Sequence, residues 1–374
     1  MSHSTSSTQS DHSTASSPHQ TALFSSGDSL QQAPYTSMIV LDAGGSKTDA
    51  MWVSNQGKIL NYIQGGTGNY QATGLTATHQ LYKELIDALL VDATDRASIA
   101  VCVGGLSGLD RTQDHQRLEH MLSSITSAPL QLMNDTFLIL RAGSAMNIGI
   151  AVVCGTGSNC VGINAQGERA NIGGLGYEFG DWGGGHDLAV SAMRAAFRGS
   201  DGRGKTTLLT QAIKQTYHVK DLLELVDFFI ADAPQELDWG LITPLLFECA
   251  QQQDEIALEL LQQAAEEYAL CVIKLAQKLF TKQEEFSLVL GGSVFQKASY
   301  PYMKDHMIHL IQKSYPHIKP ITLQSPPIVG AVLYGLDHLA ISADHASSQA
   351  LTHQIHHQTF IDHFMQQMHT LNLM

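Results

Sequence analysis

The sequence is poor in positive charge and in long apolar runs, and each shortage excludes a class of protein. It holds 21 lysine and arginine residues against 35 aspartate and glutamate residues, for a formal net charge of −14. A chain this acidic is not expected to take a nucleic acid or an anionic lipid surface as its main partner. No apolar run approaches the ~18 residues that cross a bilayer. The richest run, Ile148–Cys154, has the length of a strand.

Cysteine is scarce as well. The five cysteines form no CxxC pair: Cys102, Cys154, Cys160, Cys249 and Cys271. This spacing indicates neither a disulfide framework nor a zinc site, and it predicts a protein of the reducing cytoplasm. Cys102 and Cys154 fall in apolar segments typical of strands, so we expect them in the core rather than as reactive thiols.

The two ends of the chain differ from the rest. Residues 1–36 are rich in Ser, Thr, Gln and His, which predicts a disordered head without the basic start and apolar core of a signal peptide. Apolar residues at roughly helical spacing over 343–374 predict a terminal helical tail that docks on the body. Within it, His353 and His357 are a possible metal pair, although polar positions of a docked helix are the favoured interpretation.

Between these ends the 374-residue chain repeats one plan: strand, glycine turn, strand, polar turn, strand, then alternating helices and strands. The glycine turns at Gly44 and Gly155 lie about 110 residues apart, as in a duplicated domain. We predict an N-terminal domain over 37–147 and a C-terminal domain over 148–342. The fold class is α/β, with two mixed sheets, each covered by helices on both faces, that enclose a cleft.

The glycine turn that follows each opening strand is the first candidate for chemistry. The first turn reads Asp42-Ala-Gly-Gly-Ser-Lys-Thr, and its counterpart in the second half reads Gly155-Thr-Gly-Ser-Asn. Glycine lets backbone N–H groups approach an anion, and an Asp beside such a turn can hold Mg²⁺ directly or through water. Two such turns facing one cleft would clamp a polyphosphate, whereas each alone is more typical of an ordinary hairpin turn.

A third segment, Gly199–Thr206, matches the P-loop pattern letter for letter. A P-loop follows a strand, but the preceding Leu188–Phe197 has the periodicity of a helix. We therefore interpret this segment as a polar surface loop.

Two strand-to-helix junctions carry further candidates. At Asn134-Asp135 the Asp side chain could cap the helix, accept a proton from a substrate hydroxyl, or do both. At Leu290–Val294 the backbone amides could bind a nucleotide, or Ser293 could simply cap the helix.

The segment Gly173–His186 is half glycine. Such a permissive backbone is typical either of a place that a ligand approaches closely or of a mobile surface loop. Glu178 and Asp181 are candidate sugar or metal contacts there, and Trp182 could stack on a sugar or a nucleobase.

Seven motifs in this order resemble the N-acetylglucosamine kinase and BadF/BadG/BcrA/BcrD-type ATPase family, within the sugar kinase/heat-shock ATPase/actin superfamily. They are LDAGGSKTD, GGTGN, GLSGLDR, ND before a helix, CGTGSNC, GGLGYEFGDWGGG and VLGGSVF. The resemblance implies two actin-like (ribonuclease H-like) domains that close over MgATP and an amino sugar. It also implies transfer of the γ-phosphoryl group to a sugar hydroxyl.

The resemblance further implies roles for single residues. Asp135 corresponds to the catalytic Asp, and Asp42 to the residue that holds Mg²⁺ through water. The implied ATP contacts are Gly44, Gly45, Ser46, Lys47, Thr156, Gly291, Gly292 and Ser293. The implied sugar contacts are Asn69, Ser158, Asn159, Gly174, Leu175, Gly176 and Asp181.

We therefore expect a cytoplasmic, homodimeric kinase that uses ATP and Mg²⁺ to phosphorylate an amino sugar, by resemblance at the 6-OH. N-acetylglucosamine is favoured, with glucosamine and N-acetylmuramic acid as alternatives. Two other functions stay open. One is an ATPase that activates a partner redox enzyme of the 2-hydroxyacyl-CoA dehydratase type, which needs paired cysteines for an iron–sulfur cluster. The other is a non-catalytic sugar-binding regulator, although the chain has no helix-turn-helix arm.

Overall fold

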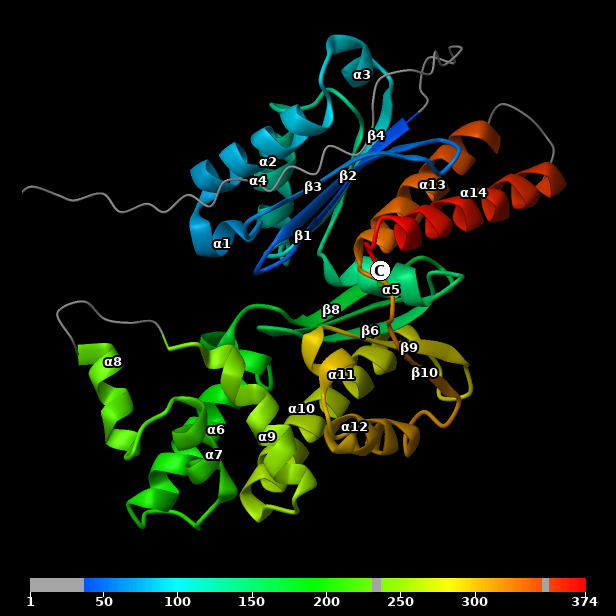
Figure 1. The fold of residues 1–374 in the computed structure, drawn as a ribbon. Helices are drawn as coiled ribbons and strands as arrows, with labels where there is room; N and C mark the ends of the chain where they lie inside the picture. Colours follow the sequence, from blue (N-terminus) through cyan, green and yellow to red (C-terminus); the bar gives the residue numbers. More distant parts are fainter. Residues whose placement is uncertain (1–36, 231–236, 345–349) are drawn as a thin grey trace, which may run out of the picture.

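The computed structural model describes residues 37–230, 237–344 and 350–374, so the predicted head lies outside the described residues. These residues form two lobes, each built on one five-stranded sheet (Figure 1). The sheet of the first lobe contains β1 (Ser37–Ala43), β2 (Thr48–Ser54), β3 (Ile59–Gly65), β4 (Ile99–Leu106) and β5 (Leu130–Met133). The sheet of the second lobe contains β6 (Gly149–Cys154), β7 (Ser158–Ile163), β8 (Arg169–Gly173), β9 (Phe286–Gly291) and β10 (Ile318–Thr322).

Helices connect and cover the strands. Those before β6 are α1 (Tyr70–Thr73), α2 (Leu75–Leu89), α3 (Ala93–Ala97), α4 (Thr112–Ser123) and α5 (Thr136–Gly143). Those after β8 are α6 (Gly185–Ser200), α7 (Leu208–Thr216), α8 (Asp227–Ile230), α9 (Ile242–Gln251), α10 (Glu255–Leu279), α11 (Ser293–Lys297), α12 (Tyr302–Gln312), α13 (Ile328–Asp344) and α14 (Ala350–Thr370). Short 3-10 turns are η1 (Tyr177–Phe179), η2 (Leu222–Val226) and η3 (Trp239–Leu241).

The two sheets have the same topology. Their strand orders are β3-β2-β1-β4-β5 and β8-β7-β6-β9-β10. In each, the first three strands form an antiparallel meander, and the remaining two run parallel to the opening strand. The predicted fold class and the duplication are confirmed. Since parallel strands end at the same sheet edge, the segments after β1, β4 and β5 lie together, as do those after β6, β9 and β10.

The space between the two sheets is filled by α5, with α13 packed against it (Figure 1). Strand β1 is buried along its whole length, as its near-continuous apolar sequence predicts for a central strand. The crossing of the two helices requires Gly330, because a Cβ there would stand 1.9 Å from the carbonyl oxygen of Leu138. The apolar core is therefore continuous from one sheet to the other.

Helix α13 also packs against β1 and β4 of the first sheet, on the face opposite α2 and α4 (Figure 1). The sequence assigns residues up to 342 to the C-terminal domain, and that division stays a prediction. In space, however, the chain returns to the first lobe after β10. The reason is that α13 is apolar over most of its length and fills the face that α2 and α4 leave uncovered.

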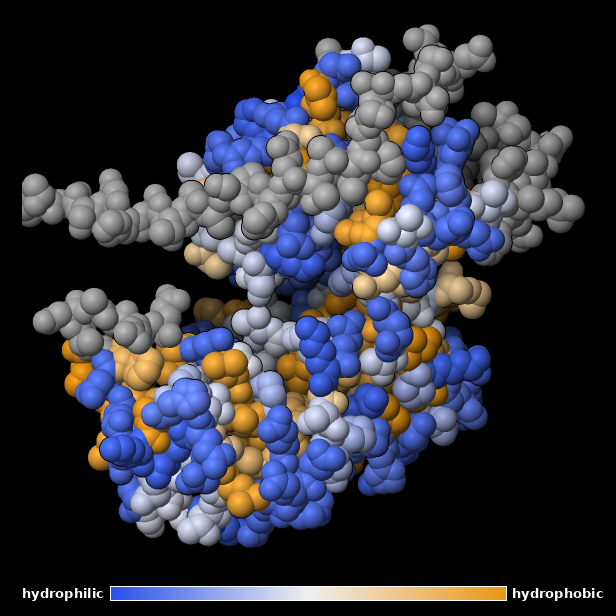
Figure 2. Space-filling model, in the orientation of Figure 1, coloured by the Kyte–Doolittle hydropathy of each residue, from blue (hydrophilic) through white to orange (hydrophobic). Residues whose placement is uncertain are grey.

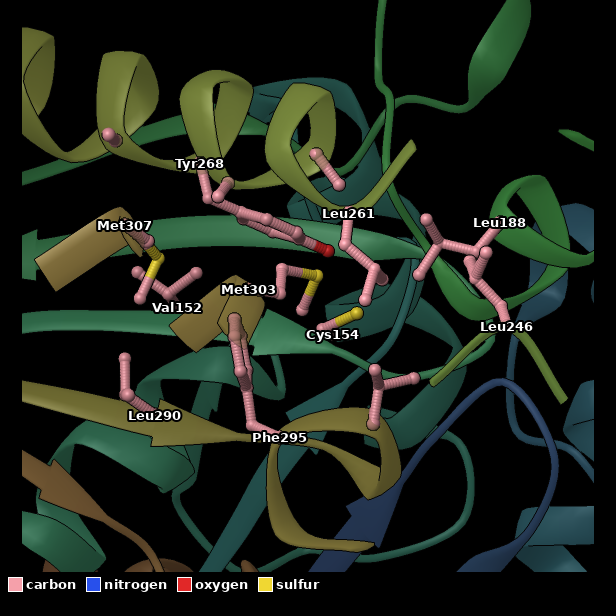
Figure 3. Close-up of a cluster of buried hydrophobic side chains, with 14 of the residues drawn as sticks. Val152, Cys154, Leu188, Leu246, Leu261, Tyr268, Leu290, Phe295, Met303 and Met307 are labelled. Atoms are coloured by element: carbon pink, nitrogen blue, oxygen red, sulfur yellow. The ribbon is translucent and has the colours of Figure 1, made fainter. Parts of the chain in front are cut away.

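The second lobe has its own core beneath β6 and β9. Tyr268 of α10, Phe295 of α11 and Met303 of α12 pack around Cys154, the last residue of β6 (Figure 3). Cys102 of the first sheet is likewise fully buried, so the prediction that both thiols are core residues is confirmed.

The predicted docking of the tail is confirmed for the described side chains of α14. Phe360, Phe364 and Met368 are buried, and the N–H of Ile59 donates a hydrogen bond to Gln367 Oε1 at 2.9 Å. The side chains of His353 and His357 lie outside the described residues. In the described parts of the chain, no helix is both long enough and apolar enough to cross a membrane.

The P-loop-like segment Gly199–Thr206 spans the end of α6 and the turn that follows, so no strand precedes it. Its Lys205 forms ion pairs with Glu255 and Glu259 of α10. The interpretation as a polar surface loop is confirmed.

Candidate active site

The two glycine turns face each other across the lobes. In the β1–β2 turn the N–H of Gly44 donates to the carbonyl oxygen of Lys47, and in the β6–β7 turn the N–H of Gly155 donates to that of Gly157. The hydroxyls of Ser46 and Thr156 lie 3.3 Å apart, so the two turns touch at their tips. This face of the molecule is hollowed between the lobes (Figure 2).

Further glycines bring two more segments onto the β6–β7 turn. Gly292 has φ +90°, and a Cβ there would stand 2.3 Å from the carbonyl oxygen of Cys154. The N–H of Gly185 donates to the carbonyl oxygen of Gly155 at 2.8 Å, and a Cβ on Gly184 would stand 2.8 Å from Gly157. Only glycine permits such close approach. Three segments therefore come together at glycine positions, with their backbones in direct contact: the segment after β6, the segment after β9 and the start of α6.

In the first lobe the same edge carries carboxylates. Asp42 of β1 pairs directly with Asp49 of β2. Asp49 accepts hydrogen bonds from Tyr62 and Gln64, each at 2.7 Å. It also forms an ion pair with Lys47 at 2.8 Å. No hydrogen bond reaches the Asp42 carboxylate from any described residue. Burial, then the charges of Asp135 and Asp49, raise the pKa of Asp42 well above its usual value, and Lys47 offsets part of this.

Asp135 begins α5 at the same edge. Its side chain makes no capping hydrogen bond; instead the N–H of Thr136 donates to Asn134 Oδ1 at 2.9 Å. Burial raises the pKa of Asp135 to about 6, although backbone N–H groups lower it in part. A carboxylate that is free of a capping role and titrates near neutrality suits a general base.

The donor set fits a hard cation held mainly through water. Asp42 is a buried carboxylate without a hydrogen-bond donor, and Asp135 and Asp49 both act on it with like charge. A divalent cation would relieve that repulsion, and Mg²⁺ commonly keeps several waters beside one or two carboxylates. No group of three His, Cys, Asp or Glu side chains within 37–230, 237–344 and 350–374 forms a ready-made metal site.

Several of the residues expected to contact the sugar gather beside Asn134. Asn159 Nδ2 donates to Asn134 Oδ1 at 3.1 Å. A Cβ on Gly174, which has φ +83°, would stand 2.7 Å from Asn159 Nδ2 and 2.9 Å from Asp110 Oδ1. Asn69 caps α1 and lies against Gly108, where a Cβ would stand 2.8 Å from its Oδ1.

The segment Gly173–His186 forms η1 and the start of α6 and is anchored to the second lobe. Cys154 Sγ and the Tyr268 hydroxyl both donate to the carbonyl oxygen of Gly183. Asp181 Oδ2 accepts from the N–H of Gly176 at 2.6 Å. The large side chains of the segment point outward: Leu175, Tyr177, Phe179 and Trp182 are exposed.

Three further residues expected to contact ligands have these places in the fold. Lys47 pairs with Asp49, and Ser158 begins β7 opposite Cys154. Ser293 is the first residue of α11, so the cap position belongs to Gly292. Gly45 is open, with no atom within 4 Å of a Cβ, whereas Gly291 packs against Ile139 of α5.

One acid of this site, Asp110, was not singled out from the sequence. It follows β4, and Asn134 Nδ2 donates to its Oδ1 at 2.9 Å. The available signal was its place in GLSGLDR, directly after a buried strand that runs parallel to β1.

Comparisons with known proteins agree with this geometry. The sequence pattern of the BadF/BadG/BcrA/BcrD ATPase family matches residues 41–335. The chain is 28% identical over 300 residues to an N-acetylmuramic acid/N-acetylglucosamine kinase of Clostridium acetobutylicum, covering 79% of this chain and 97% of that protein. It is 28% identical over 315 residues to an N-acetyl-D-glucosamine kinase of Dictyostelium discoideum, covering 80% and 97%.

Among solved structures, a candidate N-acetylglucosamine kinase of Chromobacterium violaceum matches with a TM-score of 0.60 at 24% identity, over 80% of this chain and 99% of that chain. A ROK family glucokinase of Streptomyces griseus, solved with glucose and AMPPNP, matches with a TM-score of 0.50 at 16% identity, over 80% and 98%. At these identities the structural likeness establishes the fold.

Proposed function

This chain belongs to the BadF/BadG/BcrA/BcrD ATPase family, and from that membership we propose that it is an ATP-dependent kinase that phosphorylates a hydroxyl of an amino sugar. The observation that carries the proposal is the meeting of the Ser46 and Thr156 turns at the edge where the charge of Asp135, whose side chain does not cap α5, acts on Asp42. N-acetylglucosamine is the first candidate substrate, because both curated relatives named above are kinases of that sugar.

In this proposal Asp135 is the general base. Its carboxylate accepts the proton of the attacking hydroxyl, for which we propose the 6-OH, as the hydroxyl oxygen bonds to the γ-phosphorus. The bond between that phosphorus and the β,γ-bridging oxygen breaks, and ADP leaves with the electron pair. A carboxyl group whose pKa is about 6 is ionised at neutral pH and still basic enough to assist this transfer. Asn134 takes over the capping of α5 and so leaves the Asp135 carboxylate free.

The glycine turns supply the electrostatic part. The N–H groups and hydroxyls of Gly44–Lys47 and of Thr156 bind the phosphates, and Gly291–Ser293 binds the adenosine part. Asp42 would hold Mg²⁺ through water, and the bound ion would neutralise phosphate charge. Phosphoryl transfer depends mostly on such positioning and charge stabilisation. The sugar contacts are those of the predicted set: Asn69, Ser158, Asn159, Gly174, Leu175, Gly176 and Asp181.

The cysteines disfavour the role of a redox-partner activator. All five are free, four are buried, and Cys271 is partly buried, so none of them is fully exposed to bind an iron–sulfur cluster shared between subunits. We propose a homodimer, as the resemblance implies, but one without a shared metal cluster.

The test is ADP release by the purified chain with MgATP in the absence of sugar and with N-acetylglucosamine, N-acetylmuramic acid, glucosamine or glucose. We expect N-acetylglucosamine to raise ADP release at least about tenfold over the sugar-free rate, because a positioned hydroxyl replaces water as acceptor. Sugar-independent ADP release would instead indicate an ATPase, and no release with any sugar would indicate a binding protein.

A further inference from the structure

The carboxylate of Asp110 has no role in the function proposed above. It lies between β4 and α4 at the edge that carries Asp42 and Asp135, and its Oδ1 accepts from Asn134 Nδ2 at 2.9 Å. Its Oδ2 is enclosed and takes no hydrogen bond from any residue that the structure describes. A buried carboxylate oxygen without a donor is costly in free energy, so Oδ2 calls for a partner that the folded chain does not supply.

Oδ1 begins a chain of hydrogen bonds that crosses from the first lobe to the second. A carboxylate oxygen without a proton only accepts, so Asn134 turns its Nδ2 toward Asp110 and its Oδ1 away. That Oδ1 accepts from the N–H of Thr136 and, at 3.1 Å, from Asn159 Nδ2. Asn159 Oδ1 in turn accepts from the N–H of Cys160 at 2.8 Å. The orientation of the Asn159 amide is therefore set jointly by Asp110, through Asn134, and by the N–H of Cys160.

The glycine-rich segment closes over this chain of hydrogen bonds. The position of Gly174 has room for no side chain, since a Cβ would collide with both Asn159 Nδ2 and Asp110 Oδ1. Asn159 and Gly174 are both residues for which we propose sugar contact. Asp110 thus lies against Gly174 and is linked through Asn134 to Asn159, without being one of the predicted set.

The charge environment of Asp110 favours a hydroxyl as the missing partner. Burial, followed by the charges of Asp135, Asp114 and Asp181, raises the pKa of Asp110 to about 7, and Arg111 offsets part of this. Near neutral pH the carboxyl group is therefore divided between ionised and protonated forms. A hydroxyl donates to the ionised form and accepts from the protonated one, so it suits both.

We propose that Asp110 is a sugar-binding and positioning residue of this site. Its Oδ2 forms a hydrogen bond with a hydroxyl of the sugar, while its Oδ1 orients Asn134 and Asn159. The inference rests on the proposed function, because it takes the ligand to be an amino sugar.

The test compares Asp110→Ala with Asp110→Asn in the full chain. The alanine variant loses both oxygens, and we expect the KM for N-acetylglucosamine to rise about 10- to 100-fold while the KM for ATP stays within about twofold. The asparagine variant keeps an acceptor for Asn134 and places an N–H at Oδ2. We expect it to keep the sugar KM within about threefold of the parent, with a flatter dependence on pH between about 6 and 8.

Asp114 is the matched control, four residues further on. It is fully buried, but unlike Asp110 it has hydrogen-bond donors, namely Arg111 and Tyr70. Burial alone would raise its pKa, but these hydrogen bonds lower the pKa to about 2. We expect Asp114→Asn to lower the thermal midpoint and to leave the sugar KM unchanged. The proposal is overturned if both Asp110 variants keep the parent's sugar KM. It is also overturned if Asp110→Ala raises both KM values and lowers the midpoint as Asp114→Asn does.

The outcome separates this inference from the proposed function. If the parent chain shows no sugar-dependent ADP release, the kinase proposal fails. Calorimetric titration with N-acetylglucosamine then decides on Asp110. Weaker binding to Asp110→Ala than to the parent supports its role, and identical titrations of the two chains overturn it.

Discussion

The two lobes share one strand order but carry different chemistry at the edge where they meet. In the first lobe the pair across the opening hairpin is Asp42 with Asp49, and in the second it is Val153 with Asn159. The segment after β4 carries Asp110, whereas β9 ends at Gly291 and is followed by Gly292. Duplication has kept the scaffold, while the side chains at the edge have diverged.

This difference assigns the lobes separate tasks in the proposed reaction. Carboxylates accept protons and hold cations, which are properties of side chains. Glycine backbone binds anions through N–H groups, which requires that side chains be absent. In the proposed reaction the first lobe therefore carries the proton and cation chemistry and shares the phosphate contacts through its own glycine turn. The second lobe contributes backbone contacts to the nucleotide and no carboxylate chemistry.

The substitution with the largest expected effect is Asp135→Asn. It removes the base and keeps the side chain's shape, so we expect kcat to fall about 10²- to 10⁴-fold while the sugar KM changes little. The parent's kcat/KM should rise with pH through an apparent pKa near 6, because only the ionised carboxylate accepts the proton, and the variant should lack this rise. Steady-state ADP release from pH 5 to 8 measures both.

The matched substitution in the second lobe is Thr156→Val. Since Thr156 is proposed to contact phosphate, we expect its loss to raise the KM for ATP and to leave the pH dependence intact. Near-normal turnover in Asp135→Asn would remove that residue from the base role, and loss of the pH dependence in Thr156→Val would remove the division of tasks between the lobes.

Much of this arrangement was predictable because it is local in sequence. The apolar strands and glycine turns alternate with a regular spacing, so the segments 38–43 and 149–154 could be predicted as opening strands. The motif Asn134-Asp135 marked a strand-to-helix junction that the structure confirms. The resemblance added the roles proposed for Asp42 and Asp135, which no local pattern supplies.

What could not be predicted depends on contacts between distant segments. Asp110 follows β4 and contacts Asn134, which follows β5. Asn134 in turn contacts Asn159, which lies in β7 of the other lobe. The ion pair between Lys47 and Asp49 across the hairpin was not predicted either, and the ATP contact of Lys47 stays a prediction. The return of α13 to the first sheet could not be read from its sequence either, since an apolar helix fits any uncovered face.

The next largest effect concerns the facing pair Asp42 and Asp49. A carboxyl group whose pKa is raised on folding costs no stability at pH values below its ordinary pKa. It lowers the stability of the fold progressively as the pH rises from the ordinary pKa to the pKa in the folded state. We expect Asp42→Asn to raise the free energy of unfolding at pH 8 by about 1–3 kcal/mol, the usual cost of a buried polar group that lacks a hydrogen-bond partner. At pH 4 the gain should vanish. Urea unfolding at the two pH values measures it.

Asp49→Asn is the control, because Asp49 already has Tyr62, Gln64 and Lys47 as partners. It loses the ion pair with Lys47, and we expect no comparable gain. Added Mg²⁺ should stabilise the parent more than Asp42→Asn. Equal gains from both substitutions, or an equal response to Mg²⁺, would contradict the difference between the two carboxylates.

The smallest expected effect separates the two lobes at their second turns, Gly57 and Gly167. Both glycines have φ +79°, but a Cβ on Gly57 would stand 2.6 Å from the carbonyl oxygen of Phe360 in α14, whereas Gly167 is open. Alanine at either position incurs the left-handed strain of about 1–2 kcal/mol, and at Gly57 it must also displace α14. We therefore expect Gly57→Ala to lower the unfolding free energy by about 1 kcal/mol more than Gly167→Ala. The amide of Ile59, which donates to Gln367, should exchange its hydrogen faster in Gly57→Ala alone. Equal losses and equal exchange would mean that α14 does not restrain this turn, and the second turns would then not distinguish the two lobes.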